Sequence, residues 1–258
     1  MFSLVGIIGV GTVGGALSEY FKKRTEQIVL YDTLKKLGSP AEVNRAEIVF
    51  ICVPTPFVSG KGFDSSAIEE AVGLLVDPKV VVIKSTVLPG TTERLQAMYP
   101  QHQLLMNPEF LREDSAVEDM INPERQIVGY TKASRRVASQ LMSLLPPAKI
   151  QKIVTSTEAE VIKYFGNAFL ATKVMLANQF YDLCQALGAD YRVVRKLVGA
   201  DERIGPSHLA VAHGRERGYG GKCLPKDIKT IISLAEAMKV PFSLLTEVDR
   251  INSEWQKK

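Results

Sequence analysis

The feature that most constrains the fold is a series of six short apolar runs in the first 150 residues, separated by helical patterns. The runs are Leu4–Ile8, Ile28–Tyr31, Ile48–Val53, Val80–Ile83, Gln103–Met106 and Ile127–Gly129. Because they lack a polar alternation, we expect strands buried on both faces, as in a parallel sheet covered by helices. The repeated order of strand and helix predicts an α/β, doubly wound (Rossmann) domain.

After residue 150 the pattern becomes helical. Thr157 and Glu160 have the spacing of a capping box, which predicts the start of a long helix there. Further helical patterns cover residues 190–199, 226–238 and 242–257. We therefore expect a doubly wound domain at 1–150 and an all-helical central domain at 151–258.

Composition narrows the classes of function. The chain has 258 residues, of which 46% are hydrophobic and 23% charged, and a net charge of +4 without a basic stripe, so we expect no nucleic-acid partner. No apolar run is long enough to span a bilayer, so we expect no membrane partner. The three cysteines favour a reducing compartment, the cytoplasm, over a disulfide framework. No Cys/His pair has metal-ligand spacing, so we expect no metal.

A glycine-rich turn follows the first predicted strand. Its sequence, Gly9-Val10-Gly11-Thr12-Val13-Gly14, is a G-x-G-x-x-G run that opens a helical pattern. Gly9 permits the tight turn, Gly11 lets the backbone approach a pyrophosphate, and Gly14 lets the helix pack on the strand. The helix N-terminus, from Thr12 and Val13 onward, would offer its unpaired N–H groups to phosphate.

An aspartate ends the next strand. Asp32 lies 23 residues after Gly9, where a carboxylate accepts hydrogen bonds from ribose hydroxyls and repels a 2′-phosphate. Lys35 and Lys36 weaken that repulsion only slightly. The sequence therefore predicts NAD as the cofactor, in preference to NADP.

The stretch GYGGKCLPKD at 218–227 places a cysteine between three glycines and a proline. Its glycines, Gly220 among them, allow close approach of a ligand, and Pro225 suits the first position of a helix. Cys223 would then lie at a helix N-terminus, whose dipole stabilises a thiolate. Cys52 and Cys184 lie among apolar neighbours and are expected only to pack.

Three further groups are candidates that the residues alone leave open. Lys163 and Asn167 are four residues apart on the long predicted helix and share a face, which suits stabilisation of an alkoxide. A solvated lysine and a surface amide fit the same spacing. Glu109 follows a predicted strand at the ligand-binding edge, as a base or water-orienting group or as an ordinary loop carboxylate, and the stretch that contains Thr86 follows another strand at the same edge.

Seven motifs in order carry a resemblance to the UDP-glucose/GDP-mannose dehydrogenase family. They are the G-x-G-x-x-G run at 9–14, Cys52-Val53-Pro54-Thr55-Pro56, Lys84-Ser85-Thr86, Asn107-Pro108-Glu109-Phe110-Leu111, Lys163-x-x-x-Asn167, Arg203-Ile204-Gly205-Pro206 and Gly220-Gly221-Lys222-Cys223-Leu224-Pro225-Lys226-Asp227. Their order and rough spacing match from residue 3 to about 255.

The resemblance implies an NAD-dependent enzyme of polysaccharide biosynthesis that oxidises the C6 alcohol of a nucleotide sugar, such as UDP-glucose, to a carboxylate without a metal. It implies that Cys223 attacks the C6 aldehyde to give a thiohemiacetal and then a thioester. Lys163 and Asn167 would stabilise the oxyanion. Asp227 would hold water or accept a proton, and Glu109 and Thr86 would assist the hydrolytic water.

The remaining site residues also come from the resemblance. Those implied to bind NAD are Gly9, Gly11, Thr12, Val13, Gly14, Asp32, Lys36, Val53, Pro54, Thr55 and Thr86. Those implied to bind substrate are Glu109, Phe110, Leu111, Lys163, Asn167, Arg203 and Gly220. Arg203 matches a position that reaches substrate across a dimer interface, and the central helices are expected to form a homodimer.

The chain is expected to be a short form that lacks the family's C-terminal UDP-binding domain. It would act as a compact dehydrogenase, with Arg215, Arg217 and Lys222 contacting phosphate, or with a partner chain that supplies the domain. Two alternatives stay open. One is a single-step NAD-dependent dehydrogenase of a smaller hydroxy acid or alcohol, and the other is a non-catalytic NAD-binding protein.

Overall fold

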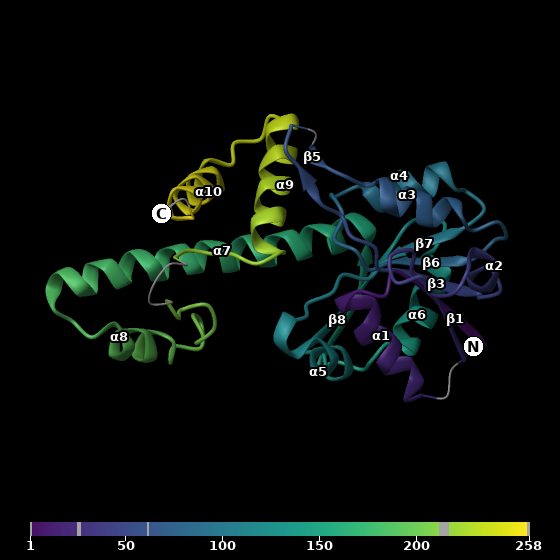
Figure 1. Cartoon of the computed structure of the whole chain (residues 1–258), viewed down its shortest axis with the longest axis horizontal. Helices are drawn as coiled ribbons and strands as arrows, with labels where there is room; N and C mark the ends of the chain where they lie inside the picture. The colour runs from purple at the N-terminus through teal and green to yellow at the C-terminus, as the bar shows by residue number, and fades with distance from the viewer. Residues whose placement is uncertain (1, 25–26, 61, 212–216, 257–258) are drawn as a thin grey trace. The chain divides into compact units, whose positions relative to one another are not determined.

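The structure is a computed structural model that describes residues 2–24, 27–60, 62–211 and 217–256. The chain divides into two compact units, Met1–Lys163 and Tyr164–Lys258. Figure 1 follows the elements along the chain, and each unit is described by itself below.

The first unit is built on a seven-stranded sheet. Its strands are β1 (Leu4–Ile8), β2 (Gln27–Tyr31), β3 (Ile48–Ile51), β6 (Val80–Ile83), β7 (Gln103–Met106), β8 (Arg125–Tyr130) and β9 (Ile150–Thr155). They lie in the order β2-β1-β3-β6-β7-β8-β9. The first five are parallel, β8 is antiparallel to β7, and β9 is parallel to β8. The strand order reverses at β1, so the β1–β3 crevice is where a doubly wound sheet binds its ligand.

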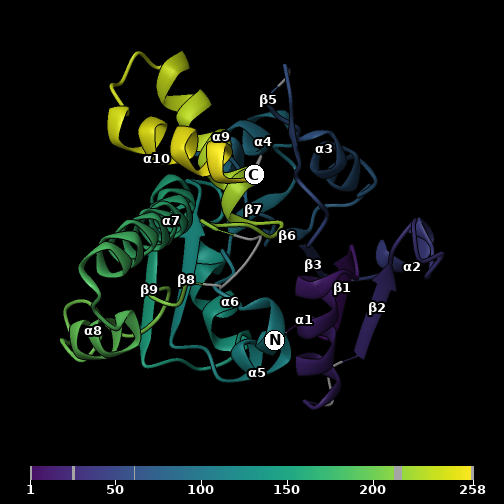
Figure 2. The same cartoon turned by 60° about the vertical axis from the view of Figure 1, so that its left-hand side comes forward.

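Helices cover both faces of this sheet (Figure 2). Helices α1 (Thr12–Lys22), α5 (Ala116–Ile121) and α6 (Ala138–Leu144) share one apolar core with β1, β3 and β8. Helices α2 (Pro40–Val43), α3 (Ser66–Gly73) and α4 (Thr91–Met98) share the other. Short elements complete the unit: the hairpin β4 (Phe57–Val58) and β5 (Gly62–Phe63), and the 3-10 turns η1 (Glu113–Ser115) and η2 (Arg135–Val137).

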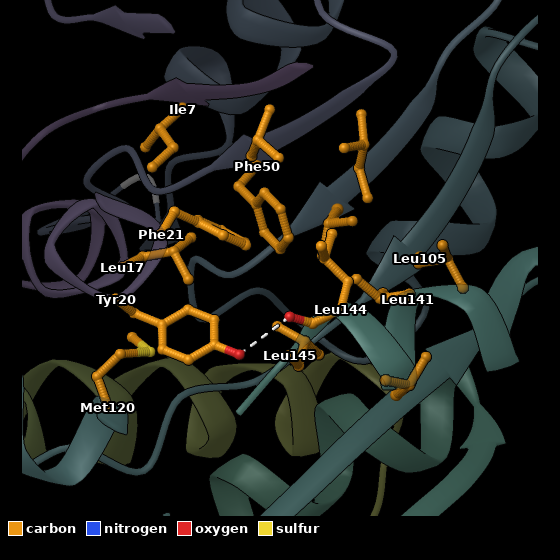
Figure 3. Packing of buried hydrophobic residues seen from close by; sticks show 14 of the residues in the cluster. Ile7, Leu17, Tyr20, Phe21, Phe50, Leu105, Met120, Leu141, Leu144 and Leu145 are labelled. Atoms are coloured by element: carbon orange, nitrogen blue, oxygen red, sulfur yellow. Dashed lines mark hydrogen bonds between the residues drawn. The ribbon is translucent and has the colours of Figure 1, made fainter. Parts of the chain in front are cut away.

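Figure 3 shows the first of these cores at close range. Phe21 and Phe50 are fully buried with their ring centroids 5.6 Å apart. The Tyr20 hydroxyl, also buried, donates to the carbonyl oxygen of Leu144 at 3.2 Å. This bond ties α1 to the end of α6 and satisfies a polar group that would be costly to bury alone.

The doubly wound α/β fold is confirmed, and each of the six predicted strands is present. Strand β9 was not expected and lies beyond the boundary placed at residue 150. Its residues are mostly exposed, including Ile150 at 55%, so it lacks the continuous apolar run that marked the buried strands. The reversed direction of β8 was not expected either, because side-chain pattern carries no information on strand direction.

The second unit is helical, as expected, in the residues that the structure describes. Helix α7 (Ser156–Leu187) begins in the first unit and continues through the second, followed by α8 (Tyr191–Val198), α9 (Leu224–Ala237) and α10 (Ser243–Trp255). One apolar cluster joins α7 to α9 and α10, and another joins α7 to α8 (Figure 1). Asp190 caps α8 by accepting from the backbone N–H of Arg192.

The capping box predicted for the long helix is displaced by two residues. Thr155 and Glu158 form it, with Glu158 accepting from the Thr155 backbone at 2.7 Å and donating its own N–H to the Thr155 hydroxyl at 3.3 Å. The expectation for Thr157 and Glu160 is therefore wrong. Both pairs have the same spacing, and only the end of β9 at Thr155 decides between them.

No helix among residues 2–24, 27–60, 62–211 and 217–256 combines the length and apolar character needed to cross a membrane.

A substitution in β8 tests the packing of α7 on the sheet. A Cβ on Gly129 would lie 2.7 Å from the Ala159 Cβ and 2.9 Å from the Ser156 Cα, both on α7. Gly129→Ala should therefore lower the free energy of unfolding by about 1–3 kcal/mol, as overpacking does. Urea unfolding followed by circular dichroism measures it. In the control, Gly15→Ala, the added Cβ meets nothing within 4 Å in a helix, so stability should hold or rise. Equal effects of the two changes would contradict this packing.

Candidate active site

The turn between β1 and α1 has the geometry that the glycine fingerprint requires. Gly9 has a positive φ of 84°, and a Cβ there would lie 2.8 Å from the carbonyl of Cys52 at the end of β3. A Cβ on Gly14 would lie 2.0 Å from the Gly9 carbonyl oxygen. Gly11 is the N-cap of α1, with open space around it. Only glycine fits at Gly9 and Gly14. The open space at Gly11 leaves the helix N-terminus accessible to a phosphate.

Asp32 lies beside this turn. Its carboxylate accepts from the backbone N–H of Val10 at 2.7 Å and of Lys35 at 2.8 Å. Burial opposes its ionisation, but these hydrogen bonds and the nearby Lys35 ammonium hold its pKa below the usual range. Lys35 also donates to the Val10 carbonyl oxygen at 2.5 Å, whereas Lys36 is exposed with a φ of 53°.

This turn and carboxylate fit a dinucleotide. The carboxylate has four lone-pair positions, of which backbone N–H groups occupy part, so it keeps acceptor capacity for ribose hydroxyls. Thr12 and Val13 form the first turn of α1, whose first N–H groups have no partner within the helix.

Two hydrogen bonds donated by hydroxyl groups connect the loop after β3 to the loop after β6. The Thr55 hydroxyl donates to the Thr86 carbonyl oxygen at 2.7 Å, and Ser85 donates to the Val53 carbonyl oxygen at 2.7 Å. Pro54, which lies between Val53 and Thr55 in the sequence, is exposed. These hydrogen bonds hold the two loops together at one edge of the sheet.

Cys52 sits in the same region and is a packing residue. Burial raises the pKa of its thiol to about 12, although the ammonium of Lys84 opposes this. A thiol with that pKa is protonated at neutral pH and is a poor nucleophile. The structure thus agrees with the role expected for Cys52.

Lys84 directly follows β6 and carries a buried ammonium group. Its Nζ donates to Oδ1 of Asn107 at 2.7 Å, and the Asn107 amide donates to the carbonyl oxygen of Ile127 at 2.7 Å. Burial lowers the pKa of Lys84 to about 8, with Cys52 and Glu109 opposing and Lys163 adding to the shift. The motif Lys84-Ser85-Thr86 was singled out for its threonine, and the lysine was missed. A lysine directly after an all-apolar strand was the signal available.

Among the ion pairs described in the first unit, the pair of Glu109 and Lys163 is the most buried. Oε1 of Glu109 lies 2.8 Å from the Lys163 Nζ, and both side chains are nearly buried. The second oxygen accepts from the Leu111 backbone N–H at 2.8 Å. Burial opposes ionisation of Glu109, but Lys163 and these hydrogen bonds hold its pKa below the usual range. Phe110 lies beneath Lys163, with its ring centroid 5.8 Å from Nζ.

Glu160, three residues before Lys163 on α7, was assigned only to a cap by the sequence. Its buried carboxylate instead accepts from the backbone N–H groups of Gly90 and Thr92, at 2.6 and 2.8 Å, and from the Thr92 hydroxyl at 2.6 Å. Burial raises its pKa despite these bonds. The residue thus caps α4, which follows the loop that bears Thr86. No local pattern signals a contact across 68 residues.

In the second unit, Cys223 is the exposed N-cap residue of α9. Pro225 occupies the second helical position, because the helix begins at Leu224 and not at the proline as predicted. Gly218 and Gly221 have positive φ values of 80° and 73°, so the turn before the cysteine uses conformations that glycine favours. The location predicted for the thiol, beside a helix N-terminus, is confirmed.

Asp227 lies one turn into α9 and is buried. Its Oδ2 accepts from the Asn167 amide at 2.5 Å, and its Oδ1 lies 2.5 Å from the Lys226 Nζ. The bond to Asn167 connects the cysteine-bearing helix to α7. Residues that the sequence placed in one site, Asn167 and Asp227, are therefore in direct contact.

Other predicted residues lie apart from these contacts. Arg203 is 88% exposed and pairs with Asp201, and Gly220 is exposed. Arg215 lies outside the described residues. Arg217, expected to contact phosphate, donates four hydrogen bonds to Asn178 and Asp182. The guanidinium has five N–H groups in all, so these four contacts leave one donor for a phosphate.

The buried Lys84 predicts a pH dependence of stability. Its pKa is about 8 in the folded chain and near 10.5 when unfolded, so the unfolded chain binds more protons between these values. The free energy of unfolding should therefore rise with pH in that window, by up to about 3 kcal/mol from this group. Lys84→Met should remove this rise in urea unfolding at pH 7–10.5, whereas Lys132→Met, at an exposed position, should keep it. Identical pH profiles of the two variants would contradict the assignment.

Comparisons with known proteins agree with this geometry. Residues 35–145 match the NAD binding domain of the UDP-glucose/GDP-mannose dehydrogenase family, and residues 157–254 match its central domain. UDP-glucose 6-dehydrogenase TuaD of Bacillus subtilis (strain 168) is 34% identical over 227 residues, which are 83% of this chain and 48% of that protein. UDP-glucose 6-dehydrogenase of Rickettsia conorii is 34% identical over 250 residues, covering 92% and 55%.

A solved structure extends the match to the fold. The UDP-glucose dehydrogenase from the hyperthermophilic archaeon Pyrobaculum islandicum superposes with a TM-score of 0.87 at 29% identity, covering 98% of this chain and 68% of that one. The chain spans about half the length of the curated relatives it matches. On these matches, the chain belongs to the UDP-glucose/GDP-mannose dehydrogenase family and carries the family's NAD-binding and central domains.

Proposed function

We propose that this chain oxidises the C6 alcohol of a nucleotide sugar of the UDP-glucose type to the carboxylate, with NAD as the acceptor. The observation that carries the proposal is the hydrogen bond between Asn167 and Asp227. It ties an amide of α7 to the helix whose N-cap is the exposed Cys223. A chain that only bound NAD, or oxidised an alcohol once, would not need a nucleophile in this place.

Two oxidations separate an alcohol from a carboxylate, and Cys223 links them. In the first, the C6 alcohol loses a hydride and a proton to become an aldehyde. The Cys223 thiolate then attacks that carbon, so that a C–S bond forms and the carbonyl oxygen takes a proton to give a thiohemiacetal. Loss of a second hydride and that proton gives a thioester. Water then adds and the C–S bond breaks, which releases the acid and restores the thiol.

Lys163 and Asn167 suit the negative charge that develops on the C6 oxygen. Lys163 contributes a positive charge held in a nearly buried ion pair, and Asn167 a side-chain amide. Fixed donors aimed at a developing oxyanion lower the barrier most when water is excluded. Asp227, already bonded to the amide, would accept a proton or hold water.

Glu109 and Thr86 would assist the hydrolytic step. The pKa of Glu109 is held below its usual range, so the carboxylate is ionised at neutral pH and can accept hydrogen bonds from water. Phe110 and Leu111 follow it in the same loop and would line the sugar side of the site. Gly220 and the surface residue Arg203 would make further substrate contacts, Arg203 from the second protomer of a dimer.

The β1–α1 turn and the ends of β3 and β6 would hold the cofactor. Gly9, Gly11, Gly14 and the first turn of α1 would bind the pyrophosphate. Asp32 would bind the ribose, with Lys36, Val53, Pro54, Thr55 and Thr86 around the remainder. Two NAD molecules would bind in succession, and each would accept one hydride per substrate in this scheme.

The same scheme assigns different roles to the two parts of the chain. We propose NAD binding for residues 1–150, and dimer formation and the nucleophile for residues 151–258. An exposed reactive thiol suits a reducing compartment, so we propose the cytoplasm and a role in polysaccharide biosynthesis.

The stoichiometry of NADH tests the reaction. The chain is incubated with NAD and, separately, UDP-glucose, GDP-mannose and UDP-N-acetyl sugars, and NADH and acid are measured together. Two NADH and one carboxylate per sugar are expected. Cys223→Ser should lower acid formation at least ~100-fold, because a hydroxyl is a much weaker nucleophile than a thiolate. Cys184→Ala, at a buried cysteine of α7, should retain it.

The other outcomes are distinct. One NADH per substrate with an aldehyde or ketone product would indicate the single-step dehydrogenase. NAD binding without turnover of any sugar would indicate a binding protein. Unchanged acid formation in Cys223→Ser would exclude the covalent route.

An exposed apolar stripe on α7 supports a homodimer. Its side chains are all at least half exposed and follow the spacing of a helix seam: Phe165, Phe169, Leu176, Phe180, Leu183 and Leu187. Three of these side chains, Phe169, Leu176 and Phe180, line an apolar cavity of about 400 Å³ together with residues of α8. Patches of this kind mark protein interfaces, and we propose that the stripe of a second copy covers this one.

Sedimentation velocity tests the dimer. The wild-type chain should sediment as a dimer at micromolar concentration, and Phe180→Asp should shift it to monomer because a carboxylate would be buried without a partner. Leu34→Asp, at a position 88% exposed on the first unit, is the matched control and should remain dimeric. A wild-type monomer would contradict the proposal.

A further inference from the structure

The side chain of Arg217 anchors the start of the loop that ends in Cys223 to α7. Its Nε donates to Oδ1 of Asn178 at 2.7 Å, and an Nη donates to the Asn178 carbonyl oxygen at 3.0 Å. The two Nη atoms also contact the Asp182 carboxylate at 3.0 and 2.9 Å. Both partners are on α7 and one turn apart. The planar fork of the guanidinium satisfies both at once.

Aromatic rings also contact this guanidinium. Its central carbon lies 5.3 Å from the ring centroid of Tyr181 on α7 and 4.9 Å from that of Trp255 on α10. Such contacts add to the attraction of a cation that is partly withdrawn from water. Trp255 is the only tryptophan of the chain, so its emission reports on this contact.

The residues after Arg217 are fixed in turn. The Gly218 N–H donates to Asn178 at 3.3 Å. Tyr219 exchanges two backbone bonds with the side chain of Asn252 on α10, at 2.8 and 3.0 Å, and its hydroxyl contacts Asp249 at 3.0 Å. A Cβ on Gly218 would lie 2.2 Å from the Asn252 Oδ1, so the backbone passes tightly between the helices.

The stretch between this anchor and the thiol is short and open. Three residues, Gly220 to Lys222, separate Tyr219 from Cys223, and a Cβ on Gly220 or Gly221 would meet nothing within 4 Å. These glycines have no packing of their own to set the path of the chain. Its direction is therefore set upstream, at residues 217–219, and downstream, by α9.

We propose that Arg217 is a positioning residue for Cys223, because it clamps the start of this loop to α7 and α10. The inference rests on the proposed role of Cys223 as nucleophile. Lysine cannot replace the arginine, since a single ammonium group cannot bridge Asn178 and Asp182 as a fork does.

The reactivity of the thiol tests this. Wild type, Arg217→Lys and Arg250→Lys are treated with iodoacetamide from pH 6 to 9, and the rate of alkylation at Cys223 is followed by peptide mass spectrometry. Arg250 is on the exposed side of α10, where it pairs with Glu247 and Glu254, and serves as the control. Both changes keep the charge. The charged groups that adjoin the loop stay in place: Asp182 on α7, Asp249 on α10, and Lys222, Lys226 and Asp227 beside the thiol.

Arg217→Lys should slow alkylation at pH 7 about fivefold and move the rate profile to higher pH, as loss of the helix-terminus position of the thiol predicts. Trp255 emission should change in the same variant. Arg250→Lys should change neither. Equal alkylation rates in Arg217→Lys and wild type would overturn the inference, even with altered Trp255 emission.

A second variant distinguishes loss of the clamp from loss of folding. Asp182→Asn leaves the arginine in place but weakens its clamp, and should slow alkylation in the same direction by a smaller factor. No slowing in a folded Asp182→Asn chain would contradict the clamp. The proposed reaction fails separately. If Arg217→Lys slows alkylation but no nucleotide sugar is oxidised, the positioning role stands and the dehydrogenase does not.

Discussion

The hydrogen bonds to the buried carboxylate of Glu160 are the contacts on which the loops at one edge of the first unit's sheet depend. This carboxylate accepts two backbone N–H groups and a hydroxyl at the start of α4, so it fixes the loop after β6 against α7. Three residues later on the same helix, Lys163 pairs with Glu109 from the loop after β7. One helix therefore sets the position of two loops at the ligand edge of the sheet. A buried carboxylate is tolerated there because the N-terminus of α4 stabilises negative charge.

The next groups on this helix serve the second unit. Asn167, four residues after Lys163, holds Asp227 of α9, and Asn178 and Asp182 hold Arg217. Polar side chains on α7 thus fix both ends of the segment that carries Cys223, whereas its apolar side chains form the exposed stripe.

Both burial and the nearest polar partner distinguish residues of the same type in this protein. Cys52 and Cys223 are both thiols, yet burial raises the pKa of the first to about 12 while the second is exposed at a helix N-terminus. Lys84 and Lys163 are both buried, but Lys84 has a neutral amide as its hydrogen-bond partner and Lys163 has a carboxylate. The same residue types therefore serve packing in one place and suit chemistry in the other.

The sequence by itself determined the elements that depend on local pattern. Continuous apolar runs identified the buried strands, and the glycines at 9, 11 and 14 with Asp32 identified the dinucleotide turn, because sterics and hydrogen bonding within a few residues dictate both. Only the tertiary structure decided the exposed strand β9, the direction of β8, the role of Glu160 and the clamp formed by Arg217. Each of these depends on partners distant in the chain, and side chains that meet only after folding leave no periodic signal in the sequence.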